Sequence, residues 1–179
     1  MSKSLKAIFC CYFIARGTMA FAGCGVLPDE REIIQGPFST PMIKGAEISV
    51  VPSDEKGGIA LVLNRPSQSG GEKDRYVVDV YEEDGGISEV ETILFQPVKG
   101  VKNVVVLISR KVCLMALGTH GRYYEIHSYE PTPKGTLAEN EVVKYDRESS
   151  GMDGFSEGEP VVFVYKNAEL IRWYLEKFK

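Results

Sequence analysis

Both histidines of the chain lie in one segment, LGTHGRYYEIH at 117–127. His120 stands between two glycines, which place it in a loop, and Arg122 and Tyr124 follow within four residues. A loop histidine beside Arg and Tyr could act as a general base or line a ligand pocket, because imidazole titrates near neutral pH. The alternative is a glycine-rich turn that leads into a strand. No serine or cysteine stands in a nucleophile elbow, so the segment predicts a binding surface made by His120, Arg122 and Tyr124 and no catalytic residue.

An acidic segment, YDRESSGMDGFSEGE at 145–159, offers a second candidate site. Counted from Asp146, positions one, three, five, six and twelve are Asp146, Glu148, Ser150, Gly151 and Glu157. This spacing resembles a calcium-binding EF-hand loop, in which oxygen ligands alternate and a final Glu binds through both oxygens. An EF-hand loop joins two helices, however, whereas both flanks of this segment are typical of strands. The alternative is a solvated hairpin loop, and no metal is predicted.

A third candidate is Arg65, which closes the apolar stretch GIALVLNRP at 58–66. Arg is enriched at binding hot spots, so Arg65 could anchor an acidic partner. The alternative is that it marks the end of a strand. The glycine pairs at 57–58 and 70–71 do not form a phosphate loop, because neither opens a helix or precedes Lys-Ser/Thr. Zinc sites need several Cys or His ligands at short spacing, so no cofactor is predicted.

The elements that must position these residues are strands. Eight segments are rich in β-branched and aromatic residues and are separated by Gly, Pro and Asp: 46–52, 58–66, 75–84, 90–98, 102–112, 122–131, 141–146 and 160–166. They predict a mainly β fold, an antiparallel sandwich or barrel of about seven to eight strands. The segment KVCLMALG, residues 111–118, fits either a short helix ended by Gly118 or a bent continuation of the preceding strand.

The C-terminal segment NAELIRWYLEKFK, residues 167–179, is different, because its apolar residues recur at helical spacing. Asn167 can cap the first turn through its side-chain oxygen. Glu169 near the start and Lys177 near the end suit the helix dipole. The sequence therefore predicts one amphipathic helix that packs across the sheet or closes a barrel mouth.

The N-terminus, MSKSLKAIFCCYFIARGTMAFAGCG, has the order of an export signal. Lys3 and Lys6 precede a nine-residue apolar run, which is too short to span a bilayer as a helix, and small residues follow. Residues 1–23 are predicted to be a signal peptide, and the alternative is a buried N-terminal strand or helix. Residues 24–45 hold three prolines and are predicted to be a tether, and 46–179 a single β-rich domain.

Two cleavage signals overlap before Cys24. Ala20-Phe21-Ala22 suits an ordinary signal peptidase that cuts before Gly23. Residues 21–24, Phe-Ala-Gly-Cys, resemble a lipobox, and residues 1–25 thus resemble the export signals of bacterial lipoproteins as a targeting class. This resemblance implies a lipid on Cys24 and attachment to the bilayer, and it says nothing of activity. Phe21 departs from the pattern, which prefers Leu or another aliphatic residue.

The chain has four cysteines, of which Cys10 and Cys11 leave with a cleaved signal. If Cys24 is lipidated, Cys113 stands alone and should be a buried free thiol, since free Cys packs as a small hydrophobe. If Cys24 is an ordinary residue, it can pair with Cys113 in an oxidising compartment.

The charge balance restricts the partners. Residues 24–179 carry 18 of the 21 basic side chains and all 25 acidic ones, a net charge of −7 with neutral histidine. An acidic chain argues against nucleic acid and anionic lipid as general partners, because both require clustered Lys and Arg. It suits a basic protein partner.

Together these features predict a non-enzymatic domain on the periplasmic side of a bacterial envelope, lipid-anchored or else soluble or secreted. It would act by binding another protein, as an inhibitor or immunity protein does. Two alternatives are a structural or assembly lipoprotein of an envelope complex and a hydrolase that uses His120.

Overall fold

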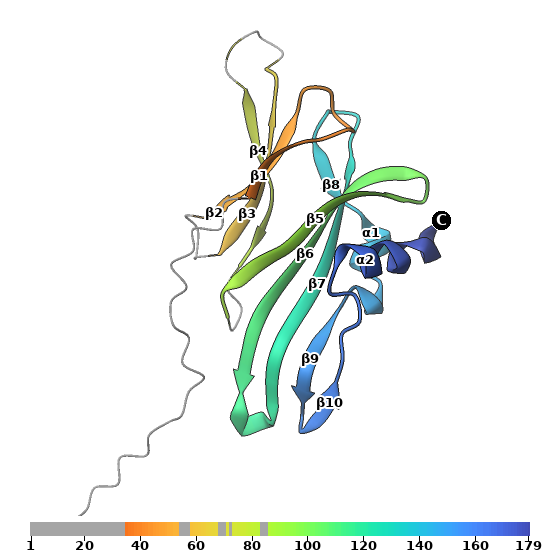
Figure 1. Cartoon of the computed structure of the whole chain (residues 1–179). Coiled ribbons are helices and arrows are strands. Elements are labelled where there is room, and N and C mark those ends of the chain that lie inside the picture. The colour runs from red at the N-terminus through yellow and green to blue at the C-terminus, as the bar shows by residue number, and fades with distance from the viewer. Residues whose placement is uncertain (1–34, 54–57, 68–70, 72, 83–85) are drawn as a thin grey trace, which may run out of the picture.

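The computed structural model describes residues 35–53, 58–67, 71, 73–82 and 86–179, and in them strands form two antiparallel sheets (Figure 1). The N-terminal sheet has the order β1-β2-β3-β4: β1 (Gln35–Ser39), β2 (Glu47–Pro52), β3 (Ile59–Arg65) and β4 (Asp74–Tyr81). The C-terminal sheet has the order β10-β9-β7-β6-β5, with β8 paired to β7: β5 (Ser88–Val98), β6 (Val101–Leu114), β7 (Thr119–Pro131), β8 (Leu137–Glu139), β9 (Ser150–Ser156) and β10 (Glu159–Val161). The predicted mainly β fold is confirmed, as a sandwich of two open sheets and not as a closed barrel.

The helices are short. They are η1 (Met115–Leu117), α1 (Glu141–Lys144), η2 (Arg147–Ser149), α2 (Ala168–Leu175) and η3 (Glu176–Phe178). The predicted cap of α2 is confirmed, because the Asn167 side chain accepts a hydrogen bond from the Leu170 N–H at 3.0 Å. None of the helices in the described residues has the length and apolar character needed to cross a membrane.

Strand β6 lies between two hydrophobic cores. Val104, Val106 and Ile108 pack against the N-terminal sheet, whereas Val105 and Leu107 pack on the opposite face, beneath α2. Both faces of the strand are therefore dry, and this is why its sequence is a continuous apolar run and does not alternate with polar residues. The predicted position of the C-terminal helix across a sheet is confirmed.

Several element boundaries correct the sequence-based predictions. Strand β1 lies inside the range predicted to be a tether, 24–45, so the folded domain begins before residue 46. Residues 141–146 do not form a strand, because Asn140 accepts hydrogen bonds from the N–H groups of Val142 and Val143 and starts helix α1. The segment 160–166 is strand only as far as Val161. The predicted signal peptide at 1–23 lies outside the described residues.

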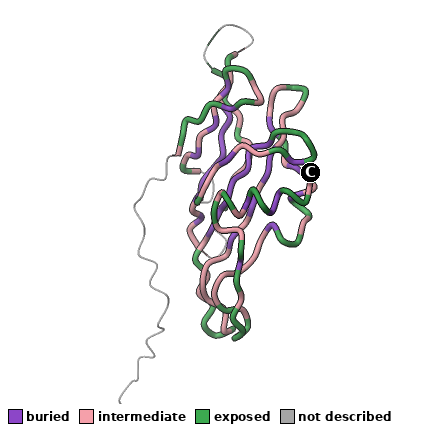
Figure 2. The backbone as a smooth tube through the Cα atoms, turned by 45° about the vertical axis from the view of Figure 1, so that its right-hand side comes forward, coloured by how far each residue is buried: buried purple, intermediate pink, exposed green. Residues whose placement is uncertain are grey.

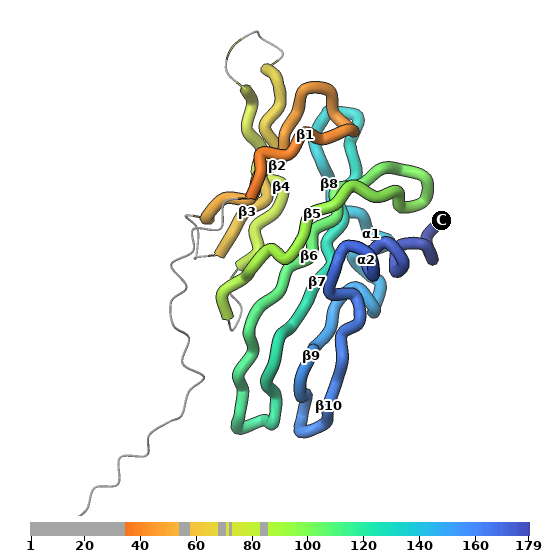
Figure 3. The backbone as a smooth tube through the Cα atoms, in the orientation of Figure 1, coloured from red at the N-terminus to blue at the C-terminus, as the bar shows by residue number. Residues whose placement is uncertain are grey.

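The strands of the C-terminal sheet are longer than the N-terminal sheet and helix α2 that cover its two faces. In Figures 1 and 3 the β6–β7 and β9–β10 hairpins extend side by side beyond the N-terminal sheet and α2, and we call residues 110–122 with β9 and β10 the arm. Figure 2 shows the buried residues gathered where the layers overlap. No residue of 110–122 or 150–161 is buried.

Candidate binding surface

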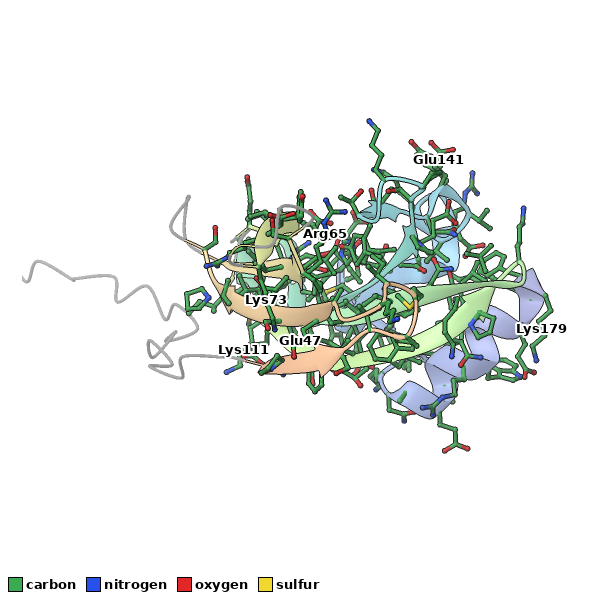
Figure 4. The ribbon with its side chains drawn as sticks, turned by 90° about the horizontal axis from the view of Figure 1, so that it is seen from above. Glu47, Arg65, Lys73, Lys111, Glu141 and Lys179 are labelled. Carbon is green, nitrogen blue, oxygen red and sulfur yellow. The ribbon has the colours of Figure 1, made fainter. Side chains whose placement is uncertain are left out.

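Arg65 joins the two sheets and is largely used inside the fold. Its Nη1 donates to the carbonyls of Lys134 at 2.6 Å and Gly135 at 2.9 Å in the β7–β8 turn, and its Nη2 donates to the Tyr76 hydroxyl at 2.6 Å. In the view from above, Arg65 lies between the N-terminal sheet and that turn (Figure 4). Only 14% of the side chain is exposed. Arg65 is thus placed to hold the sheets together more than to contact a partner.

His120, Arg122 and Tyr124 share one face of β7, as their spacing of two residues requires. Tyr124 belongs to the core beneath α2, where its ring stacks on Phe163 with centroids 5.4 Å apart. Burial, followed by the charge of Glu91, raises its pKa above the ordinary value of 10. Its hydroxyl therefore stays protonated at neutral pH.

Arg122 is held by two carboxylates of β5. Its Nη1 lies 2.7 Å from Glu89 Oε2 and 2.8 Å from Glu91 Oε1, and the Ser109 hydroxyl donates to the same Glu91 oxygen at 2.6 Å. Burial lowers the pKa of Arg122, but the Glu89 hydrogen bond and both negative charges outweigh it and raise the pKa. The guanidinium is thus a fixed cation that balances two acids of its own sheet.

His120 offers no catalytic arrangement among the described residues. Its ring stacks on Phe155 at 4.9 Å, and its buried Nδ1 has no hydrogen-bond partner there. A general base of a hydrolase needs an orienting acceptor and a nucleophile within hydrogen-bond reach. His120 Nδ1 has no orienting acceptor in the described part of the chain, and Cys113, which pairs with His120 across the β6–β7 ladder, is disulfide-bonded and offers no free thiol, so the hydrolase alternative gains no support.

The acidic segment 145–159 does not fold as an ion-binding loop. Asp146 caps η2, and Ser150–Ser156 form strand β9, which runs away to the end of the arm. Asp146 and Glu148 both bind Lys177 Nζ at 2.8 Å, whereas Glu157 lies at the far turn. The five positions of the calcium pattern are therefore separated, and the hairpin-loop alternative is also wrong, because most of the segment is strand.

The end of the β6–β7 hairpin presents large apolar side chains to solvent. Leu114, Met115 and Leu117 are 52%, 58% and 66% exposed, and we call these three residues the apolar tip. They lie on and beside the single turn η1, which Gly118 ends in a left-handed conformation at φ 63°. KVCLMALG is thus strand as far as Leu114 and then one helical turn. The sequence signal was three large apolar residues in four, a pattern that fits a strand or helix as well as an exposed surface.

Two carboxylates stand beside the apolar tip. The turn of the neighbouring hairpin is fastened to it, because Gly158 N–H donates to the Gly118 carbonyl and Glu157 N–H to the Thr119 hydroxyl, both at 3.0 Å. Glu157 and Glu159 are exposed there, and neither has an ion-pair partner in the described residues. The arm thus ends in an apolar surface with an unbalanced acidic side.

A hollow of about 320 Å³ lies at α2. It is lined by Glu148, Tyr165, Trp173, Tyr174, Glu176 and Lys177. Its charges are paired within the fold, since Lys177 binds Glu148 and Lys179 binds Glu176. The exposed acids beside the apolar tip therefore make the tip the stronger candidate for binding a partner.

Among the described residues, one group of side chains has the types and spacing to hold a metal ion: Asp79, His127 and Glu139. It lies between the two sheets, away from the arm's end. This group was not predictable from the sequence, because its members come from three strands and have no local spacing in common.

Cys113 is half-buried on β6 and is disulfide-bonded, and its partner cysteine lies outside the described residues. Of the two alternatives for Cys113, its disulfide agrees with pairing and not with the free thiol that was expected if Cys24 is lipidated. Cys24 also lies outside the described residues, so its lipidation stays a prediction.

Comparison of the chain with protein-family models, with curated proteins and with solved structures finds no match.

Proposed function

We propose that the protein is an exported, non-catalytic envelope domain that binds a basic protein through the end of its arm. The observation that carries this proposal is the apolar tip: three large apolar side chains, each more than half exposed, at the end of the β6–β7 hairpin, which extends beyond the N-terminal sheet and α2 (Figure 1). Clusters of this kind on soluble proteins mark interaction sites, because exposing them to water is unfavourable.

The arm's construction supports this assignment. Its residues contribute nothing buried, so neither hydrophobic core requires strands of this length. The fastening of the two hairpin turns holds the apolar tip in one position beside Glu157 and Glu159. A surface that is held before binding loses less conformational entropy when a partner docks.

Charge selects the class of partner. Exposed, unpaired carboxylates beside an apolar patch attract a surface rich in Lys and Arg and repel an anionic lipid surface. The net charge of −7 on residues 24–179 acts in the same direction. A basic protein is therefore favoured over a membrane as the ligand of the tip, in keeping with an inhibitor or immunity role against a secreted basic enzyme.

The compartment is proposed from the N-terminal signal, to which the disulfide at Cys113 adds support, since disulfides persist in oxidising compartments. A lipid on Cys24 and a Cys24–Cys113 disulfide are alternatives, because each uses the Cys24 sulfur and a cleaved signal leaves no other cysteine. The lipid would leave the arm facing the periplasmic space, and the disulfide would belong to a soluble form in the same space.

A photo-crosslinking amino acid placed at Met115 of the full chain, in the cells that produce it, tests the proposal. The matched control is Val77, which is 61% exposed on the N-terminal sheet, away from the arm. We expect a crosslink from Met115, absent from Val77, to a protein with a basic isoelectric point, which the charge reversals Glu157→Lys and Glu159→Lys abolish.

Crosslinks to lipid alone, equal crosslinking from Val77, or no adduct would overturn the proposed binding role. Intact mass spectrometry of the same sample reports the N-terminus and distinguishes a diacyl group on Cys24 from a disulfide. A cytosolic protein that begins at Met1 would overturn the export.

A further inference from the structure

Three metal-ligating side chains meet where the two sheets of the sandwich pack together. Asp79 comes from β4 of the N-terminal sheet, and His127 and Glu139 come from β7 and β8 of the C-terminal sheet. One ligand atom from each lies within 4.8 Å of the others, and all three side chains are half-buried. His127 Nδ1 is 3.8 Å from Glu139 Oε1.

A β-bulge directs Asp79 toward this point. In the β3–β4 ladder Leu61 pairs with Asp79 but Val62 pairs with Val77, so Val78 has no partner. Val78 packs against the core between the sheets, and after the extra residue Asp79 faces the same way. Bulges re-aim side chains in this manner, and regular alternation would have turned Asp79 outward.

Buried hydroxyl groups hold the Asp79 carboxylate in position. The Tyr129 hydroxyl donates to Asp79 Oδ2 at 2.6 Å, and the hydroxyls of Tyr129 and Tyr81 are hydrogen-bonded at 2.8 Å. The other oxygen, Oδ1, accepts from the Val80 N–H at 2.8 Å. Both tyrosines are almost fully buried. Outer partners that fix a carboxylate in this way are a regular feature of metal sites.

The imidazole of His127 is oriented by two aromatic rings and makes no hydrogen bond within the described residues. Its ring lies 5.0 Å from the Tyr81 ring and is stacked on the Tyr129 ring at 6.4 Å. Neither ring nitrogen hydrogen-bonds to a side chain or backbone group of the described residues. Glu139 gives one oxygen to Lys144, and its other oxygen is the one that faces His127. Two carboxylates thus share this space, with Lys144 as the cation hydrogen-bonded to one of them.

We propose that Asp79, His127 and Glu139 together bind a divalent cation of the Zn²⁺ class, which links the two sheets. One nitrogen and two oxygen ligands suit Zn²⁺, and they do not suit Ca²⁺, which takes six to eight oxygens. Each ligand atom must move by less than about 1 Å to reach the usual Zn–N and Zn–O distances of about 2.0–2.2 Å. The ion offsets the repulsion between the carboxylates and completes the contact of β4 with β7 and β8. This site is independent of the apolar tip.

The test uses the untagged full chain, stripped of metal with a chelator and titrated with Zn²⁺ alone. The chain has two histidines, so NMR spectra of the histidine rings contain two spin systems. We expect the His127 ring signals to shift at one equivalent and those of His120 to stay, and Ca²⁺ to move neither. At a free Zn²⁺ concentration 100 times the dissociation constant, thermal unfolding should move up by roughly 5–10 °C.

Variants separate ligation from folding. His127→Ala should weaken Zn²⁺ binding at least tenfold, as should the conservative changes Asp79→Asn and Glu139→Gln. Glu139 is half-buried and belongs to neither core cluster, so Glu139→Gln leaves the cores intact. His120→Ala is the matched control and should bind as the unaltered chain does. Unshifted His127 signals at saturating Zn²⁺, or undiminished binding by both His127→Ala and Glu139→Gln, would overturn the assignment.

Discussion

The strands β6 and β7 pass through two regions that differ in what covers them. Between the N-terminal sheet and α2, both faces of β6 are buried, whereas in the arm the described residues of the same strands are half-buried or exposed. The sequence changes accordingly, from the apolar run at 104–108 to RKVCL at 110–114, where charged and apolar residues mix. The covered region provides the hydrophobic stabilisation, and the arm uses the same ladder of hydrogen bonds to carry a surface away from it.

The largest expected effect comes from making the same change, Leu to Ala, in the covered region and in the arm. Leu107 is fully buried beneath α2, and Leu117 is 66% exposed at the apolar tip. Leu107→Ala should lower the free energy of unfolding by about 2–5 kcal/mol, because it leaves a cavity in the core. Leu117→Ala should change it by less than about 0.5 kcal/mol. Urea unfolding of the two variants measures both, and comparable losses would mean that the tip is part of a core.

The stability of the arm should instead depend on the close contact between the backbones of β7 and β9. Gly154 of β9 has φ +143°, and a Cβ there would lie 2.4 Å from the His120 carbonyl oxygen. Gly154→Ala must therefore push β9 away from β7, at a cost of about 1–3 kcal/mol. Hydrogen exchange should speed up in β9 and β10 and stay slow in β5 and β6.

The matched control for that substitution is Gly158→Ala in the turn of the same hairpin. Gly158 also has a positive φ, of +85°, but a Cβ there meets nothing within 4 Å. Gly158→Ala should therefore cost only the conformational free energy of placing Ala in the left-handed region, about 1–2 kcal/mol. If both variants released β9 to the same extent, close strand contact would not be what holds the arm.

Local patterns predicted the parts of the molecule that depend on local causes. The run at 102–112 indicated a strand, and Asn167 indicated the start of α2, because strand propensity and capping act within a few residues. Strand β1 was missed, because its pairing with β2 is a tertiary contact and its sequence, QGPFS, is a poor strand former.

The candidate sites were harder to predict, for two physical reasons. Asp79, His127 and Glu139 meet only once the sheets pack, and the bulge at Val78 that directs Asp79 inward leaves no mark in the local pattern. The apolar tip was visible as LMAL, but exposure is a property of what surrounds a residue. Arg65 and Arg122 were noticed for their chemistry, and the fold uses both internally.

The ion pairs of Lys177, at the joint where the covered region meets the arm, should give the smallest change in stability when they are removed. Their contribution depends on pH. Lys177, just after α2, binds Asp146 and Glu148 where the chain enters β9. Burial raises the pKa of Asp146, but the hydrogen bonds from Lys177 and the Glu148 N–H outweigh it and lower the pKa below 3.8. The folded state therefore gains stability above pH 4, and this gain is lost as the pH falls through the lowered pKa.

Asp146→Asn keeps the cap of η2 and removes the charge, so it isolates the ion pair. We expect it to lower the free energy of unfolding at pH 7 by less than about 1 kcal/mol, because both side chains keep contact with water, at 33% exposed for Lys177 and 21% for Asp146. The free energy of unfolding of the Asp146→Asn variant should fall less between pH 4 and pH 2 than that of the unaltered chain. Glu157→Gln removes one charge without an ion pair in the described residues and should leave the acid dependence unchanged. If the two variants lost stability in parallel on acidification, net charge and not this joint would set the response.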